Sequence, residues 1–314
     1  MTDQTRRVPT GEPPEVVIEN MTTIIDDQPV LYRLDLTIPA GETTVLMGPS
    51  GVGKSTLIKH IVGLLRPDGG SIRIGDRDVW SASPREWEKI YRDVGAMLGG
   101  SFLVTSSTFA SLSALDNLIF TLEALGVPLE QRRDRALARL RELDLEEYAD
   151  HTPSQLAAHA TKRLALARAL VTDAPFVILD EVEVGLDKNH SDQIIAAVRA
   201  LRERTGCTLL ITTHDLDLAQ TLADKLAIMV SGQVVRTGSP KELLDGISST
   251  EDFDQVYQFS RETGPINLGE ALRAVDWGDS APPKQRNDRA MIALGVAAVL
   301  VIVALLILLR VHIL

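Results

Sequence analysis

A glycine-rich stretch near the start of the chain, GPSGVGKST, has the residue types and spacing of a loop that binds a phosphate chain. It fits the pattern G-x-x-x-x-G-K-[ST], follows the apolar run TTVLM and opens a helical pattern, which is the context that the pattern requires. Glycines allow backbone N–H groups to face phosphate oxygens, and the helix start adds partial positive charge. We expect the Lys54 ammonium to reach the β- and γ-phosphates and the Ser55 hydroxyl to hold Mg²⁺. The residues predicted to bind the nucleotide are Gly48, Pro49, Ser50, Gly51, Val52, Gly53, Lys54, Ser55 and Thr56.

Two further segments place acidic and basic groups at the ends of apolar runs. FVILDE ends in Asp180 and Glu181, and ITTHDL carries His214. Ligands bind at the carboxyl ends of parallel strands, so Asp180 is expected to hold Mg²⁺ and Glu181 to polarise an attacking water as general base. His214 is expected to contact the γ-phosphate and order that water; a structural role is the alternative for a single histidine.

Alternating apolar runs and helical patterns predict which elements position these residues. Residues 15 to about 245 read as an α/β domain with a largely parallel sheet, and a mainly helical stretch from about 112 to 170 reads as an inserted subdomain. The expected strands are Val16–Ile18, Thr43–Met47, Val94–Leu98, Phe176–Leu179, Thr208–Thr212 and Leu226–Val230. The expected helices include Lys54–Leu65, Glu130–Leu143, Ala160–Val171, Asp192–Thr205 and Leu216–Ala223, with Ser239 capping a helix that begins at Pro240.

The composition excludes several classes of function. The chain has 314 residues, is 45% hydrophobic and carries a formal net charge of −11, which disfavours a nucleic-acid partner because phosphate neutralisation needs clustered Lys and Arg. Cys207 is the one cysteine in the sequence, so neither an internal disulfide nor a thiolate metal cluster can form.

The two ends of the sequence differ in character. Residues 1–14 are polar and read as a disordered lead-in, and residues 246–289 read as a tail and linker. Residues 290–309 form a run of 20 side chains with no charge, long enough to cross a bilayer as a helix; a buried core helix is the alternative. Lys284, Arg286 and Arg289 precede this run, so the positive-inside rule predicts a single pass through the inner (plasma) membrane with the N-terminal domain in the cytoplasm.

The order of the motifs identifies a family resemblance. The phosphate loop, the segment Leu156–Ala160, the pair Asp180–Glu181, the GLD that ends in Asp187, and His214 follow one another as in ABC transporter ATPase subunits. The resemblance covers residues 15 to 245 and implies a P-loop NTPase fold with ATP and Mg²⁺ as cofactors and a transmembrane permease as partner. It also implies a head-to-tail dimer, in which each ATP lies between one chain's phosphate loop and the other chain's signature loop. Asp187 corresponds to the D-loop.

A narrower resemblance concerns the cargo. The segments MLGGS, DNL, PSQL and VYQFSRETGPI are similar to those of lipid-transport ATPases of the Mla/Mce type. This similarity implies a phospholipid, a sterol or another hydrophobic substrate, taken from or delivered to membrane lipid.

Several positions depart from the family pattern. The signature L-S-G-G-Q or L-S-G-G-M is replaced by Leu156, Ala157, Ala158, His159 and Ala160. Gly99 and Gly100 stand where the family has Phe-Gln, no aromatic residue stands near Ile25 to stack on adenine, and Val182 replaces the usual proline.

These departures leave two hypotheses open. The first is a transporter subunit that hydrolyses ATP in an asymmetric heterodimer with a second ATPase chain of intact signature, with a slow homodimer as the alternative assembly. The second is a membrane-tethered nucleotide-binding regulator with little turnover.

Overall fold

Two sheets organise the molecule in this computed structural model, which describes residues 11–99, 108–247 and 249–257. The larger sheet has the strand order β10-β9-β3-β8-β7-β6, and the smaller has the order β2-β1-β4-β5. In the larger sheet β9, β3, β8, β7 and β6 run parallel and β10 pairs antiparallel with β9. The strands are β1 Val16–Ile25, β2 Gln28–Ile38, β3 Thr43–Met47, β4 Gly69–Ile74, β5 Arg77–Asp78, β6 Val94–Met97, β7 Phe176–Asp180, β8 Thr208–Thr213, β9 Lys225–Val230 and β10 Gln233–Gly238.

The central strands β3, β7, β8 and β9 of the larger sheet are buried on both faces, and alternate residues of each of these strands belong to different cores. Val177 and Leu179 of β7 pack in one core with the helices between residues 114 and 222, while Phe176 and Ile178 pack in the other with the helix at Lys54–Ile61 and the smaller sheet. This alternation follows from the two-residue period of a strand. Burial on both faces explains why β3, β7 and β8 read as continuous apolar runs.

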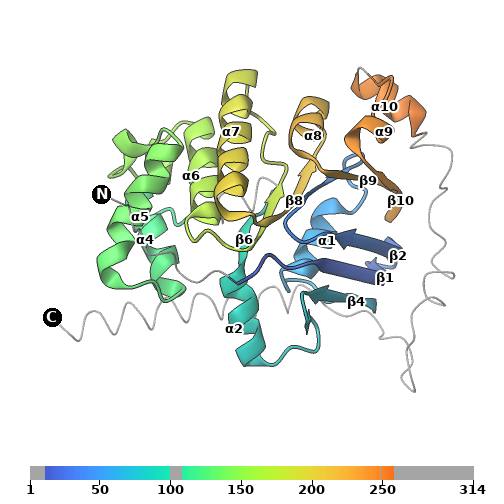
Figure 1. Ribbon diagram of the computed structural model, residues 1–314, viewed down its shortest axis with the longest axis horizontal. Helices are drawn as coiled ribbons and strands as arrows, with labels where there is room; N and C mark the ends of the chain where they lie inside the picture. The colour runs from blue at the N-terminus through green and yellow to red at the C-terminus, as the bar shows by residue number, and fades with distance from the viewer. Residues whose placement is uncertain (1–10, 100–107, 248, 258–314) are drawn as a thin grey trace.

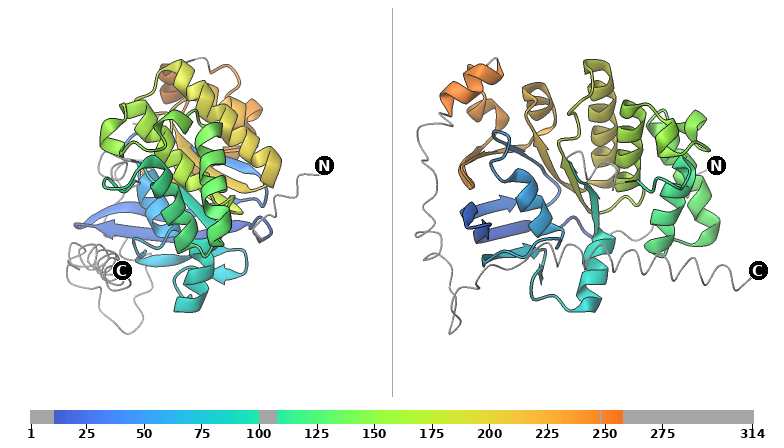
Figure 2. Two further views of the ribbon diagram at one scale, coloured as in Figure 1. Left: turned by 90° about the vertical axis from the view of Figure 1, so that its left-hand side faces the viewer. Right: turned by 180° about the vertical axis from the view of Figure 1, so that it is seen from behind.

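The helices gather in groups around the larger sheet. Figure 1 shows α6, α7 and α8 side by side above the sheet and α4 and α5 beyond α6, at the side away from β1 and β2. The view from behind in Figure 2 shows α2 below β6, at the far end from α7 and α8. The helices are α1 Lys54–Ile61, α2 Pro84–Asp93, α4 Ala114–Ala124, α5 Leu129–Glu142, α6 Ala158–Leu170, α7 Lys188–Thr205, α8 Leu216–Leu222, α9 Pro240–Leu243 and α10 Thr250–Val256, with 3-10 turns at Glu146–Tyr148 and Pro153–Gln155.

The expected strands and helices are all present, with shifted bounds. α1 ends at Ile61, four residues before the predicted end at Leu65, because the chain leaves the helix at Gly63 in a left-handed conformation. α6 begins at Ala158 rather than Ala160. Ser239 caps α9 as predicted, through a hydrogen bond from the Glu242 backbone N–H to its side chain.

Three predicted end segments fall wholly or mostly outside the described residues. These are the polar lead-in at 1–14, the tail and linker at 246–289 and the apolar run at 290–309. Within the ranges that the structure does describe, no helix is both long and apolar enough to span a membrane.

Candidate functional site

The phosphate loop joins the end of β3 to the start of α1, at the carboxyl edge of the larger sheet. Two of its glycines are required by close packing. A Cβ on Gly48 would lie 2.2 Å from the Met229 backbone oxygen, and a Cβ on Gly53 would lie 2.7 Å from the Leu31 side chain. Gly53 also has a φ of 109°, which L side chains rarely adopt. The loop therefore approaches β2 and β9 too closely for any larger residue at these two positions.

Lys54 is the first residue of α1, and its side chain is only 3% exposed. Its Nζ donates to the backbone oxygens of Gly48 (2.8 Å) and Pro49 (3.0 Å), so the ammonium lies inside the loop. Burial lowers the pKa of Lys54, and the nearby carboxylates of Glu181, Asp180 and Glu183 act in the opposite direction. A buried ammonium at a helix start can pair with an anionic ligand held by the loop.

Asp180 is the last residue of β7 and is 1% exposed. Its Oδ1 accepts a hydrogen bond from the Thr212 hydroxyl of the neighbouring strand, and its Oδ2 accepts from the Gly99 backbone N–H at 3.1 Å. The pairing of β7 with β8 places Asp180 opposite Thr212. Both carboxylate oxygens are therefore held in fixed directions at the edge where the phosphate loop lies.

Glu181 and His214 meet beside Lys54. The His214 Nε2 lies 3.2 Å from the Glu181 Oε1 and 3.5 Å from the Lys54 Nζ, and the same Oε1 lies 3.9 Å from that Nζ. Glu181 has a φ of 50°, a left-handed conformation that is uncommon for a residue other than glycine. Its backbone N–H donates to the Thr212 backbone oxygen at 3.0 Å, which anchors it in this conformation. A carboxylate, an imidazole and an ammonium thus converge at the predicted position.

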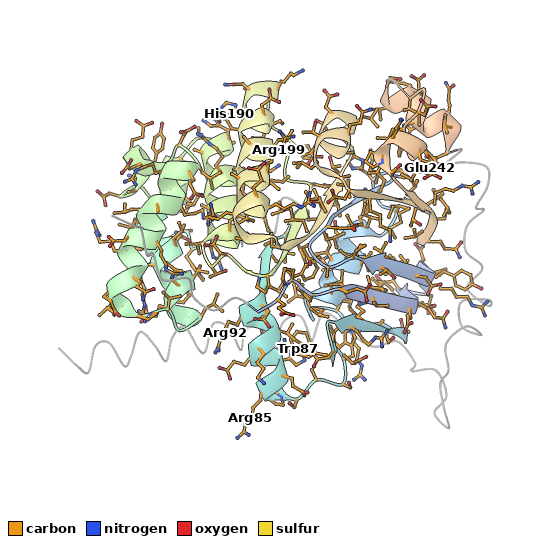
Figure 3. All side chains as sticks on the ribbon, in the orientation of Figure 1. Arg85, Trp87, Arg92, His190, Arg199 and Glu242 are labelled. Atoms are coloured by element: carbon orange, nitrogen blue, oxygen red, sulfur yellow. The ribbon has the colours of Figure 1, made fainter. Side chains whose placement is uncertain are left out.

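The segment Leu156–Ala160, which the sequence predicts to be a degenerate signature, lies at the start of α6. Ala157 is the N-cap residue and makes no side-chain cap hydrogen bond, because alanine has no acceptor to offer. The His159 ring contacts that of His190 on α7, with ring centroids 4.3 Å apart; Figure 3 labels His190 on that helix. Asp187 caps α7 by accepting from the His190 backbone N–H at 3.0 Å, and its carboxylate also lies 2.8 Å from the His190 Nδ1. The signature segment and the D-loop residue are thus linked through one histidine pair.

Sequence reasoning missed several residues that hold this site together. Gly99 appeared only as a departure from the family pattern, yet its backbone N–H binds Asp180. Glu183 was also not singled out from the sequence, although the letters EVE at residues 181–183 place a second acid two residues after Glu181. The Glu183 side chain is 7% exposed and accepts a hydrogen bond from the His214 backbone N–H. Burial raises the pKa of Glu183, while the Thr213 hydroxyl, backbone N–H groups and Lys162 act to lower it.

The residues present fit a nucleoside triphosphate with Mg²⁺. The glycine loop supplies backbone donors, Lys54 supplies a cation, and Ser55 and Asp180 supply hard oxygen ligands. Magnesium in such sites commonly takes one or two protein ligands and completes its shell with phosphate and water oxygens. The donor set therefore suits Mg²⁺ rather than a metal that prefers sulfur or nitrogen ligands.

Comparison with known proteins is consistent with this geometry. The ABC transporter family matches residues 31–183. A probable ribonucleotide transport ATP-binding protein, mkl, of Mycobacterium tuberculosis is 32% identical over 270 residues, which cover 85% of this chain and 73% of that protein. This chain belongs to the ABC transporter ATP-binding subunits.

Other relatives of this ABC ATPase carry different names. The Fe(3+) ions import ATP-binding protein FbpC of Agrobacterium fabrum is 32% identical over 241 residues, and the match covers 77% of this chain but 65% of that protein. The dimeric structure of the ATP-binding cassette MJ0796 in a post-hydrolysis state, bound to ADP and Pi, superposes with a TM-score of 0.66 at 29% identity. The superposed residues cover 72% of this chain and 98% of the MJ0796 chain. The chain is an ABC-type ATPase with the P-loop α/β fold of that family.

Proposed function

We propose that this chain is the ATP-hydrolysing subunit of a membrane ABC transporter and acts as one half of an ATPase dimer. The convergence of Glu181, His214 and Lys54 at the phosphate loop carries the proposal. Glu181 directly follows β7, His214 directly follows β8, and Lys54 begins α1. Packing alone does not require a carboxylate, an imidazole and an ammonium within 4 Å of one another.

Each residue has one role in the proposed mechanism. Lys54 and the backbone donors of residues 48–56 bind the phosphates, and Ser55 and Asp180 hold Mg²⁺, which neutralises phosphate charge when it is bound. Glu181 accepts the proton of the attacking water at Oε1. His214, whose Nε2 lies 3.2 Å from the Glu181 Oε1, orients that water beside the terminal phosphate.

The signature segment supports an asymmetric assembly. In a head-to-tail dimer the segment Leu156–Ala160 faces the nucleotide of the other chain, where Ala157 offers no hydroxyl and Ala158 and His159 add Cβ atoms. The defect therefore falls on the partner's nucleotide. A second ATPase chain with an intact signature would complete one fast site around this chain's Lys54 and Glu181. A homodimer, the alternative, would pair two intact phosphate loops with two poor signatures.

The cargo and the membrane anchor rest on sequence segments. The segments MLGGS and VYQFSRETGPI favour a lipid or another hydrophobic substrate, handed over by a permease. The names of the relatives differ in cargo, since one is an iron importer and another a probable ribonucleotide transporter. The apolar run at 290–309 would hold this subunit at the inner membrane, with its ATPase domain in the cytoplasm.

The regulator hypothesis is less well supported, because Lys54, Asp180, Glu181 and His214 are all in place. Purification of the full chain from its native membrane, with its bound partners, separates the candidates. We expect brisk phosphate release from the complex and, by native mass spectrometry, one copy of this chain with one copy of a second ATPase and a permease. Two copies of this chain with brisk hydrolysis would contradict the heterodimer, and a permease complex without turnover would support the regulator.

A further inference from the structure

Glu183 is a buried carboxylate directly behind the site. Its Oε1 accepts a hydrogen bond from the Thr213 hydroxyl and another from the His214 backbone N–H at 3.3 Å. Its Oε2 is buried and makes no hydrogen bond to any of the described residues. Burial of a carboxylate is costly, and an incompletely bonded one more so, so a hydrophobic residue of similar size would suit simple packing better.

The hydrogen bonds of Glu183 hold the turn from which His214 projects. The Thr213 hydroxyl that donates to Glu183 also accepts from the Asp215 backbone N–H at 2.9 Å. The Asp215 carboxylate in turn caps α8 by accepting from the Leu218 N–H at 2.9 Å. Residues 213 to 215 are therefore held at both ends, by Glu183 on one side and by α8 on the other.

A second contact joins this acid to the helix that carries the signature. Lys162 lies on α6, is 8% exposed, and donates from Nζ to the backbone oxygen of Val184, the residue after Glu183. Burial is the main influence on the pKa of Lys162 and lowers it, and the attraction of Glu183 opposes that effect. The groups thus form a continuous path from α6, through Lys162, Val184 and Glu183, to His214.

We propose that Glu183 is a positioning residue for ATP hydrolysis: it fixes the His214 backbone so that the imidazole meets Glu181, and it ties this turn to the signature helix. The proposal rests on the catalytic roles proposed above for Glu181 and His214. It connects α6, which faces the partner's nucleotide in the proposed dimer, to His214 of the same chain through Lys162, Val184 and Glu183.

Substitution of the acceptor tests the proposal in the full chain, purified with its native partners. Glu183→Leu leaves the Thr213 hydroxyl and the His214 N–H without their acceptor, and we expect kcat to fall by about 10²-fold with KM for ATP nearly unchanged, since a small misplacement of a reacting group has an effect of this size. Glu183→Gln retains an acceptor oxygen and should restore much of the lost kcat. Thr213→Val removes the hydroxyl that donates this hydrogen bond to Glu183. It provides the same test if Glu183→Leu does not fold, and kcat should fall in this variant as well.

Two comparisons separate positioning from general stability. In a His214→Ala background, Glu183→Leu should cause little further loss of kcat, because the two residues act through one group. Thr44→Val removes a buried hydroxyl that has no hydrogen-bond partner among the described residues, and it should leave kcat unchanged. An unaltered kcat in Glu183→Leu, or an equal loss with and without His214, would overturn the positioning role. Normal turnover in His214→Ala alone would overturn the catalytic assignment and this proposal together.

Discussion

The His214 Nε2 and the Glu181 Oε1 lie 3.2 Å apart although the residues are 33 positions apart in sequence. Each directly follows one of the adjacent parallel strands β7 and β8, whose carboxyl ends meet at one edge of the sheet. Lys54 lies at the same edge. The predicted phosphate-binding group (Lys54), general base (Glu181) and water-ordering group (His214) are therefore within 4 Å of one another.

Lys54→Ala should weaken ATP binding by roughly 10- to 100-fold, because a hydrogen bond to a charged group contributes about 1.5–3 kcal/mol. Calorimetric titration with ATP and Mg²⁺ measures the dissociation constant. Lys59→Ala, on the same helix but outside the loop, is the matched control and should bind ATP normally. An unchanged dissociation constant for ATP in Lys54→Ala would contradict the assignment of residues 48–56 as the phosphate-binding loop.

Glu181→Gln should leave ATP binding intact and slow hydrolysis by roughly 10²–10⁴-fold, the usual contribution of a general base. The amide keeps the size of the side chain but cannot take the proton of water. Single-turnover phosphate release from the purified complex provides the measurement. If the variant matches the wild type in rate, the base lies elsewhere.

Ala157→Ser should raise both stability and turnover. A serine at the N-cap of α6 can accept a backbone N–H that Ala157 leaves without a cap, which contributes about 1 kcal/mol to the free energy of unfolding. The same hydroxyl would face the other chain's nucleotide in a dimer, so hydrolysis by a homodimer should increase. Ala157→Val, which has no hydroxyl, is the control. A gain in stability without any gain in turnover would argue that the loop does not serve a nucleotide.

His60 should make stability depend on pH below neutrality. This side chain is fully buried on α1; its Nε2 lies 2.8 Å from the Thr23 hydroxyl, and its Nδ1 contacts the Leu65 backbone oxygen. Burial lowers the pKa of His60 to about 4 from the usual 6.5. Between these two values the unfolded chain binds a proton that the folded chain does not, so the contribution of the neutral ring is complete above pH 6.5 and is lost as the pH falls towards 4.

The expected loss from His60 amounts to about 3 kcal/mol in the free energy of unfolding over that range. Urea titrations at pH 7, 6, 5 and 4 measure the free energy of unfolding. Because Asp and Glu side chains also titrate in this range, they add their own pH dependence to the measured values. The informative quantity is therefore the difference from His60→Asn, whose amide can replace the Nδ1 contact and does not titrate. Parallel curves for the two proteins would show that burial does not shift the pKa of His60 between the folded and unfolded chain.

Deletion of residues 290–314 should release an ATP-binding protein that remains in solution without detergent, because the apolar run at 290–309 is lost with it. Val299→Lys tests the same segment by placing a charge at its centre, which disfavours insertion into a bilayer. Fractionation of cell extracts decides the outcome. A full-length chain found in the soluble fraction would rule out the anchor.

The sequence was most informative where burial is greatest. Strands β3, β7 and β8 are buried along their whole length, so continuous apolar runs predicted them and the site residues that follow them. The antiparallel strands β4 and β10 were not predicted, because glycines and exposed polar residues break their alternation. Helix α2 was missed although Ser83 and Glu86 form a capping box, a signal that is visible in SPREW.

The support around the site was harder to foresee than the site. A single sequence does not reveal that Glu183 turns inward while its neighbour Val184 is 50% exposed, since that depends on how the turn after β7 packs. Nor does it reveal that the rings of His159 and His190, which belong to separate helices, lie in contact. Both relationships arise from tertiary packing between segments that are distant in sequence.

The close approach of Gly99 to Asp180 restricts how this ATPase could be engineered or could have evolved. A Cβ at position 99 would lie 2.8 Å from the Asp180 backbone oxygen and 2.9 Å from its Oδ2. A side chain at position 99, such as the phenylalanine that the family resemblance would place there, requires the loop to move away from the acid that is proposed to bind magnesium. Engineering of this segment would therefore have to rebuild the loop together with residue 99 rather than replace one residue.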